Sequence, residues 1–295
     1  MNNEEVIIVG AGPAGLATAL QLERYGIRPL VIEEEKIGGL LHNANLVENY
    51  PGFPGGIRGP RLVDLFEQQV KDYELNLLHA HLENLDYSND SFEFSFEGGT
   101  LHSQLAVIAS GTKPRILRDI KIPDEVQERI YYEVYPLLNV KGKQIAIIGA
   151  GDAAFDYGLN LARDNDVYIL NRGEKISCLP LLWDRAKLNP RIHYLPQTAI
   201  TLISAGPDQK IAIECDAPLG SNNYIVDYLI CAIGRDPNLD FISGQFAEKA
   251  IQLENSGKLY YIGDVVNGLY RQTAIAVGDG ILAAMKIYKY LKENE

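Results

Sequence analysis

The chain has 295 residues, of which 46% are hydrophobic and 22% charged, and its formal net charge at pH 7 is −12. This length predicts about two domains, each able to bury a core, and the composition is typical of a globular α/β enzyme. The negative charge disfavours nucleic acids and anionic membranes as partners. Because the start, MNNEE, is polar and the next apolar run is soon broken by glycines, we expect neither a signal peptide nor a membrane span, and a cytoplasmic protein.

The chain begins with a strand–helix–strand pattern. Residues 5–10 predict a buried strand, residues 13–26 a helix and residues 28–34 a second strand. Residues 38–60 are rich in glycine and proline and predict a long irregular segment, which in a compact domain is usually functional.

The first strand and helix are joined by GAGPAG, which has the spacing GxGxxG. Gly10 permits a tight turn, Gly12 permits pyrophosphate to approach the backbone, and Gly15 permits the helix to pack closely on the strand. Glu33 follows 23 residues after Gly10, where a carboxylate can accept hydrogen bonds from ribose hydroxyls. This first glycine loop, residues 10–15, therefore predicts a dinucleotide site.

The middle of the chain leads back to the sheet. A helix is expected over residues 61–74, and the alternation over residues 91–103 predicts antiparallel strands. Residues 104–111 predict another buried strand, and residues 112–143 predict a hinge region between two domains.

The strand–helix–strand pattern then restarts over residues 144–149, 152–164 and 167–171. A second glycine loop, residues 149–154, reads GAGDAA and has the spacing GxGxxA. Arg172 follows Gly149 by the same 23 residues that separate Glu33 from Gly10. A cation at this position suits a ribose 2′-phosphate, so NADP is favoured over NAD. A fold that has kept its shape and lost its nucleotide site is the alternative.

The last third predicts more strands and one long helix. Strand-like patterns cover residues 191–195, 210–215, 224–234 and 259–266, and an apolar periodicity predicts a helix over residues 272–291.

The three cysteines, Cys178, Cys215 and Cys231, form no CxxC pair, so the sequence predicts neither a zinc site nor a local redox pair. Each is expected to be a small buried hydrophobe or a spectator thiol. No other spacing of ligands predicts a metal site.

Several motifs together resemble the thioredoxin reductases, the low-molecular-weight flavoproteins of the class II pyridine nucleotide-disulfide oxidoreductase fold. They are IGDV (262–265) followed by YRQT (270–273), GGLL with VENYPGFPGGIRGP within 38–60, ASGT (109–112) and AIGRDPN (232–238). The resemblance runs essentially from end to end.

The resemblance implies an α/β fold with two Rossmann-like, three-layer ββα dinucleotide-binding domains, the second inserted in the first. It implies an FAD-binding domain over 1–114 and 238–295, an NAD(P)-binding domain over 115–237, non-covalent FAD, NADPH or NADH as the second cofactor, and a homodimer. The FAD-binding residues implied are Gly10, Gly12, Pro13, Ala14, Gly15, Glu33, Glu34, Gly39, Leu40, Asn49, Ala109, Gly111, Gly263, Asp264, Arg271, Gln272 and Thr273. The NAD(P)-binding residues implied are Gly149, Gly151, Asp152, Ala153, Ala154, Asn171, Arg172 and Gly234.

The chain departs from the resembled family at two places. The positions of the family's redox CxxC pair hold Tyr132 and Tyr135, which cannot exchange disulfides, so ordinary thioredoxin reduction is not expected. The family's HRRxxxR clamp for the 2′-phosphate reads NRGEKIS (171–177), so any NADPH preference should be weak. His42 could donate a proton near the flavin, although a structural role is the simpler interpretation.

Without the redox pair, electrons that reach FAD must leave by another route. Related families that lack CxxC exchange electrons between NAD(P)H and ferredoxin or flavodoxin, which is the role we expect here. A reductase of a low-molecular-weight disulfide, a quinone or another small acceptor is a second hypothesis. A flavin-binding regulatory or scaffolding protein with little turnover is the non-enzymatic alternative.

Overall fold

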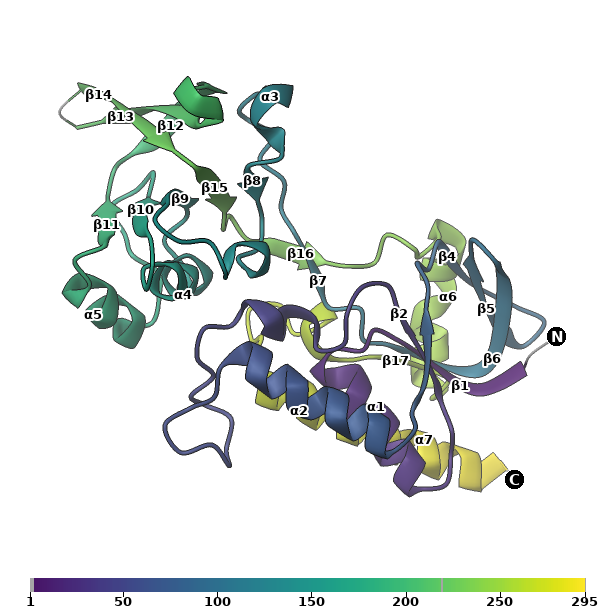
Figure 1. The fold of residues 1–295 in the computed structure, drawn as a ribbon. Helices are drawn as coiled ribbons and strands as arrows, with labels where there is room; N and C mark the ends of the chain where they lie inside the picture. The colour runs from purple at the N-terminus through teal and green to yellow at the C-terminus, as the bar shows by residue number, and fades with distance from the viewer. Residues whose placement is uncertain (1–2, 219, 295) are drawn as a thin grey trace. The chain divides into compact units, whose positions relative to one another are not determined.

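The computed structural model describes residues 3–218 and 220–294, and the chain divides into two compact units (Figure 1). Unit 1 consists of Met1–His42, Val47–Lys113 and Asp236–Glu295. Unit 2 consists of Asn43–Leu46 and Pro114–Arg235. The second unit is thus inserted in the first, which confirms the expected fold class.

Unit 1 is built on a seven-stranded sheet that runs β3-β2-β1-β6-β5-β4, with β17 pairing in parallel with β6. The strands are β1 (Asn3–Val9), β2 (Leu30–Glu33), β3 (Asn76–His79), β4 (Asn84–Ser88), β5 (Ser91–Phe96), β6 (Gly99–Ile108) and β17 (Leu259–Tyr261). The helices are α1 (Pro13–Arg24), α2 (Gly59–Asp72), α6 (Gly244–Asn255) and α7 (Thr273–Asn294).

The alternation of side chains along β1 explains the layers of unit 1. Val6 and Ile8 face one side, where they pack in a cluster with buried residues of α1 and α7. Ile7 and Val9 face the other side and pack with phenylalanines of β5 and with Phe246 of α6. A strand with both faces buried reads as a continuous apolar run, as the sequence does here.

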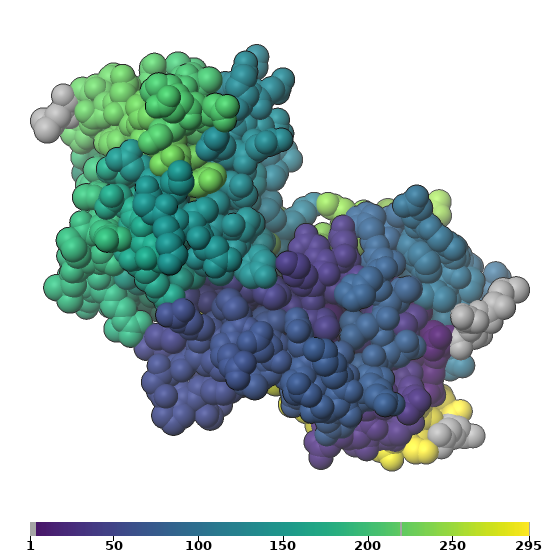
Figure 2. All heavy atoms as spheres, viewed as in Figure 1, coloured from purple at the N-terminus to yellow at the C-terminus, as the bar shows by residue number. Residues whose placement is uncertain are grey.

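Unit 2 repeats this layering with a five-stranded sheet in the order β11-β10-β9-β15-β8 and a three-stranded antiparallel sheet β12-β13-β14, green in Figure 2. The first sheet contains β8 (Ile130–Tyr131), β9 (Gln144–Ile148), β10 (Asp166–Leu170), β11 (Ile192–Leu195) and β15 (Tyr228–Cys231). The second contains β12 (Ala199–Ala205), β13 (Ile211–Ala217) and β14 (Gly220–Val226). The helices are α3 (Asp124–Gln127), α4 (Asp152–Leu161) and α5 (Pro180–Leu188).

Along β9, Ile145 and Ile147 pack in one cluster with residues of α4. Ala146 packs in another cluster with residues of β12 and β13. The central sheet of unit 2 is therefore covered by helix on one face and by a second sheet on the other.

Two features of the connections add to the sequence analysis. The two segments that join the units are β7 (Thr112–Pro114) and β16 (Arg235–Pro237), and they pair as a two-stranded sheet. β7 lies at the start of the expected hinge region 112–143, whereas β16 lies outside it. Asn43–Leu46 belongs to unit 2, although we expected residues 1–114 to lie in the FAD-binding domain. The sequence did not reveal this because the segment is held by hydrogen bonds to distant residues, Asn43 to Glu133 among them.

Among residues 3–218 and 220–294, no helix is both long and apolar enough to cross a membrane. The same residues contain no group of three or more His, Cys, Asp or Glu side chains that could hold a metal ion.

Candidate functional site

The first glycine loop has the backbone that its spacing predicts. Gly10 has φ +104°, and a Cβ there would lie 2.4 Å from the Ala109 carbonyl oxygen. A Cβ at Gly15 would lie 1.9 Å from the Gly10 carbonyl oxygen, so α1 packs directly on the turn. Gly12 differs, because nothing lies within 4 Å of a Cβ built there. The protein's own packing therefore requires glycine at positions 10 and 15, whereas Gly12 leaves space for a ligand against the backbone.

Glu33 supports this loop at the end of β2. Its Oε2 accepts a hydrogen bond from the Ala11 backbone N–H at 2.6 Å, and its Oε1 accepts one from the Glu35 N–H at 2.9 Å. The carboxylate is thereby fixed beside the loop, where the ribose of a bound dinucleotide is expected. Its neighbour Glu34 lies on the surface with Oε1 2.8 Å from His81 Nδ1.

Residues far apart in the sequence meet around the first glycine loop. A Cβ at Gly39 would lie 3.7 Å from the Cα of Gly12, and a Cβ at Gly263 would lie 2.8 Å from the Ala14 Cβ. Asn49 donates from Nδ2 to Oε1 of Gln272 at 2.7 Å, across 223 positions of sequence. The Gly39 and Gly263 segments therefore lie against the first glycine loop, and Asn49 and Gln272 contact each other.

The remaining predicted FAD residues take places along these same segments. Pro13 is the first residue of α1, and Leu40 is half-buried in a short helical turn over Gly39–Asn43. Asp264 lies in the turn Gly263–Val265, Arg271 is half-buried just before α7, and Thr273 is the first residue of that helix. Gly111 has φ +65° and nothing within 4 Å of a Cβ.

His42 is half-buried, with Nε2 2.9 Å from the Ile37 carbonyl oxygen. This contact orients the ring toward the loop of its own segment.

Two residues of α7 that the sequence analysis missed complete this region. Asp279 accepts hydrogen bonds at Oδ2 from the Gly263 N–H at 3.1 Å and from Asn267 Nδ2 at 2.7 Å. A Cβ at Gly280 would lie 2.3 Å from the Ala14 carbonyl oxygen, so α7 and α1 touch backbone to backbone. The available signal was the pair DG inside an otherwise apolar helix pattern, AVGDGILAA.

The second glycine loop has the same plan in unit 2. Gly149 has φ +133°, and a Cβ there would lie 2.4 Å from the Ala232 carbonyl oxygen. A Cβ at Gly151 would meet no backbone atom within 4 Å, its nearest neighbour being Ser177 Oγ at 3.7 Å. Asp152 is exposed, and its Oδ1 accepts a hydrogen bond from the Leu179 N–H at 2.7 Å. The Asp152 carboxylate therefore holds the neighbouring chain segment.

The remaining predicted NAD(P) residues lie around this loop. Ala153 is exposed and Ala154 is fully buried at the start of α4, and Gly234 has φ +107°. Asn171 is buried at the end of β10, and Arg172 follows it on the surface.

The tyrosines at the positions of the missing redox pair have different surroundings. The Tyr132 hydroxyl accepts a hydrogen bond from the Leu117 N–H at 3.2 Å, and burial raises the pKa of this phenol. Tyr135 is exposed, and its backbone N–H donates to Asn43 Oδ1 at 3.0 Å. Between them, Glu133 accepts a hydrogen bond from Arg235 at 3.0 Å.

The cysteines are not placed as reactive thiols. Cys215 and Cys231 are buried, and burial raises their pKa values to about 11 and about 12. Burial also raises the pKa of Cys178, and the nearby Asp152 adds to that shift. All three thiols are free and stay protonated near neutral pH, so none is a ready nucleophile.

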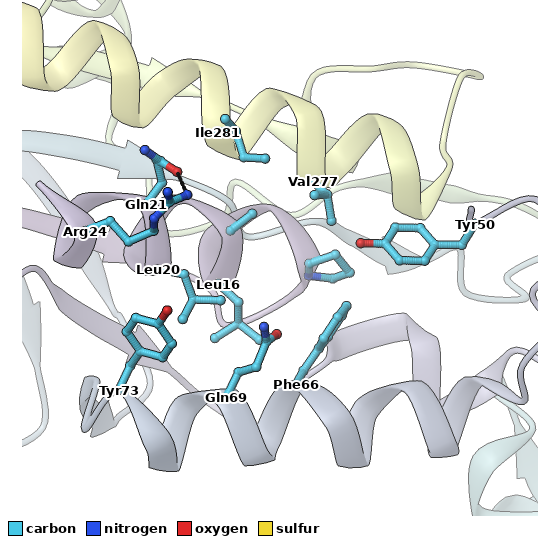
Figure 3. Close-up of a pocket in the computed structure, with 12 residues that line it drawn as sticks. Leu16, Leu20, Gln21, Arg24, Tyr50, Phe66, Gln69, Tyr73, Val277 and Ile281 are labelled. Carbon is cyan, nitrogen blue, oxygen red and sulfur yellow. Dashed lines mark hydrogen bonds between the residues drawn. The ribbon is translucent and has the colours of Figure 1, made fainter. Parts of the chain in front are cut away.

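Unit 1 also contains a mostly apolar cavity of about 310 Å³ between α1, α2 and α7 (Figure 3). Leu16, Leu20 and Phe66 line its middle, and Arg24 donates to Gln21 at 3.2 Å at one end. The lining includes no carboxylate, histidine or cysteine.

The residues around the first glycine loop fit FAD. The open space over Gly12, the backbone N–H groups at the start of α1 and the fixed Glu33 carboxylate match a pyrophosphate and its adjoining ribose.

Comparisons with known proteins agree with this geometry. The family described as "Pyridine nucleotide-disulphide oxidoreductase" matches residues 4–280. The thioredoxin reductase of Streptomyces clavuligerus is 30% identical over 308 residues, covering 97% of this chain and 93% of that protein. The thioredoxin reductase of Mycolicibacterium smegmatis is 27% identical over 312 residues, covering 99% and 97%. The crystal structure of Lactococcus lactis thioredoxin reductase in its FR conformation superposes with a TM-score of 0.86 at 25% identity, covering 98% and 99%.

Proposed function

This chain belongs to the pyridine nucleotide-disulphide oxidoreductase family, and we propose that it passes electrons from NAD(P)H through FAD directly to an acceptor outside the chain. FAD and NADPH are the cofactors of the thioredoxin reductase group within this family, and the chain is an FAD-dependent pyridine nucleotide oxidoreductase. In thioredoxin reductases, electrons leave FAD through a protein disulfide, and this chain has no CxxC pair that could form one.

The observation that carries the proposal is that the sequence contains no CxxC pair and that burial raises the pKa values of its three cysteines. Disulfide exchange needs a thiolate that attacks a sulfur atom, and a phenol offers neither. Tyr132 and Tyr135 stand at the positions of the family's pair, and burial raises the pKa of all three cysteines. A relay of electrons through this chain's own sulfur atoms therefore has no support.

The residues of unit 1 bind and orient the flavin dinucleotide in this proposal. The N–H groups of the first glycine loop and of α1 stabilise the diphosphate, and Glu33 accepts from a ribose hydroxyl. Asp279 holds the Gly263 turn that leads into α7, whose first N–H groups are available to a negative charge. Bound FAD exchanges a hydride with a nicotinamide and single electrons with other carriers.

The acceptor we propose is a one-electron carrier of the ferredoxin or flavodoxin type, because such a carrier takes electrons from a flavin without thiol chemistry. Although the relatives named above are thioredoxin reductases, thioredoxin is disfavoured here by the tyrosines. A low-molecular-weight disulfide, a quinone or another small acceptor is the second candidate, and a regulatory flavoprotein with little turnover is the non-enzymatic one. We also propose a homodimer in the cytoplasm, which a mass measurement in solution and fractionation would test.

The test is anaerobic reduction of the purified yellow protein with NADPH or NADH, followed by a panel of acceptors. We expect the flavin to be bleached by nucleotide and reoxidised by ferredoxin or flavodoxin, with no useful rate toward thioredoxin. A variant with all three cysteines replaced by serine should keep its activity with a one-electron dye. Reduction of thioredoxin, or loss of dye activity in a folded, FAD-loaded cysteine-free variant, would refute direct transfer. Bleaching with no reduction of either protein carrier would assign the small-acceptor role.

A further inference from the structure

The turn that follows β10 is closed by the side chain of Asn171. Asn171 is buried, and its Oδ1 accepts a hydrogen bond from the Gly173 N–H at 3.0 Å. Its Nδ2 donates to the Lys175 carbonyl oxygen at 3.2 Å and to the Tyr194 hydroxyl at 2.8 Å. One amide group therefore holds both ends of the turn 171–175 and ties it to the neighbouring strand β11.

The backbone that follows β11 holds the same turn. The Gln197 N–H donates to the Gly173 carbonyl oxygen at 2.9 Å, and the Thr198 N–H donates to the Asn171 carbonyl oxygen at 2.8 Å. The Asn171 N–H donates in turn to the Leu195 carbonyl oxygen at 3.0 Å. Because these bonds come from both sides, the turn is fixed before any ligand arrives.

The charges on the turn are arranged unequally. Arg172 and Lys175 are both exposed, and neither forms an ion pair within residues 3–218 and 220–294. The Glu174 carboxylate, by contrast, accepts a hydrogen bond at Oε1 from Gln197 Nε2. Within the described residues, the turn thus presents two cations outside any ion pair, while its one carboxylate is held by an amide.

We propose that Asn171 and Gln197 are positioning residues that set the preference of the second nucleotide site for a ribose 2′-phosphate. Asn171 keeps Arg172 and Lys175 in one fixed turn, and Gln197 keeps the Glu174 carboxylate away from the ribose. This inference rests on the proposed function, because it requires that the second glycine loop bind NAD(P)H.

A carboxylate that is free to approach the nucleotide ribose changes which nucleotide the site prefers. A carboxylate at the end of the second strand of such a fold accepts hydrogen bonds from the 2′-hydroxyl of NAD and repels the 2′-phosphate of NADP. Glu174 lies two residues beyond Arg172, so a side chain released from Gln197 could take that role. The amide of Gln197 would therefore favour NADP by restraining a group that favours NAD.

The test compares the dissociation constants of NADP⁺ and NAD⁺, measured by calorimetry on the FAD-loaded protein. Gln197→Met keeps the shape of the side chain and removes the amide, so it should lower the preference for NADP⁺ by about threefold to tenfold. The double variant Gln197→Met with Glu174→Gln should recover the preference, because the released carboxylate is gone. Gln68→Met is the control, since it breaks a similar amide–carboxylate contact, to Asp72, in unit 1.

A second variant tests the turn itself. Asn171→Ala should weaken NADP⁺ by about tenfold and NAD⁺ much less, so that the KM for NADPH rises about tenfold while the KM for NADH rises much less. Equal weakening of both nucleotides by Asn171→Ala would overturn its role in selectivity. An unchanged preference in Gln197→Met, or one that Glu174→Gln does not restore, would overturn the role of Gln197. If the unaltered protein binds neither nucleotide, the proposed function fails first, and the two failures are distinguishable.

Discussion

Replacing Asp156 by asparagine should stabilise unit 2, and the gain should depend on pH. Asp156 lies on α4 directly after the second glycine loop, and its Oδ2 accepts a hydrogen bond from the Asn45 N–H at 2.8 Å. Burial is the main cause that raises the pKa of this carboxyl from 3.8 to about 6, with the Asn45 hydrogen bond and Arg163 opposing it. The folded protein therefore holds a proton at Asp156 more tightly than the unfolded chain does.

The size of the effect follows from that difference. At about 1.4 kcal/mol for each tenfold change in proton affinity, a pKa raised from 3.8 to about 6 corresponds to at most about 3 kcal/mol. Because the folded-state pKa of Asp156 is higher than its unfolded-state pKa, the contribution of this carboxyl to the free energy of unfolding is most favourable below about pH 4. The contribution falls as the pH rises to about 6 and is level above that. Asparagine keeps an oxygen that can accept from Asn45 and carries no charge. We expect Asp156→Asn to raise the free energy of unfolding by about 1–3 kcal/mol above about pH 7 and to change it little near pH 4.

The single tryptophan of the chain, Trp183, lies in unit 2, so its fluorescence reports the unfolding of that unit. Urea titrations of the FAD-loaded protein at about pH 4 and about pH 7.5 would measure the two free energies. Asp166→Asn is the matched control, because Asp166 is exposed on the same unit. An equal gain at both pH values, or no gain at the higher one, would show that the buried charge is not what limits stability.

Two further substitutions test the flavin site, one at the first glycine loop and one at the turn before α7. Gly12→Asp would place a carboxylate in the open space over the loop, so the variant should purify with less than about a tenth of the normal FAD, read from its visible absorbance. Gly244→Asp, at the start of α6 where a Cβ also meets nothing, should stay yellow, and full occupancy in Gly12→Asp would show that FAD is not bound there. Asp279→Ala removes the acceptor for Gly263 and Asn267, and it should raise the dissociation constant of FAD by about tenfold. If Asp279→Ala binds FAD as tightly as the unaltered protein, the turn before α7 does not depend on that carboxylate.

The sequence predicted those parts of the site that depend on local backbone chemistry. Gly10 and Gly149 both have positive φ, and each lies against the backbone carbonyl of the residue that follows a neighbouring strand of its sheet, β6 or β15, which no other residue allows. Spacing within a few residues determines such turns, so the two glycine loops and their strands could be identified from the letters alone.

The parts that could not be predicted depend on contacts between distant segments. Asp279 supports the Gly263 turn only because α7 folds back over it. The sequence pattern of a single carboxylate in an apolar helix does not indicate which group it will bind. Asn43 belongs to unit 2 because Glu133 and Tyr135 bind its side chain, about 90 positions along the chain. The resemblance implied both Glu33 and Glu34 as FAD-binding residues, yet Glu33 bonds to the glycine loop while Glu34 meets His81 on the surface.

The position of β17 and α7 in unit 1 has a consequence for how the protein is made. Both elements come from the last 37 residues, and unit 1 needs them because β17 pairs with β6 and α7 packs on α1. Unit 2 is complete once Arg235 has been synthesised, so the inserted unit can fold on the ribosome while the earlier-made first sheet still lacks its outer strand and its covering helix. The flavin site, although it begins at residue 10, is then the last part of the molecule to mature. A chain truncated after residue 240 would lack β17 and α7 and would leave apolar residues of β6 and α1 uncovered, the kind of surface that chaperones bind.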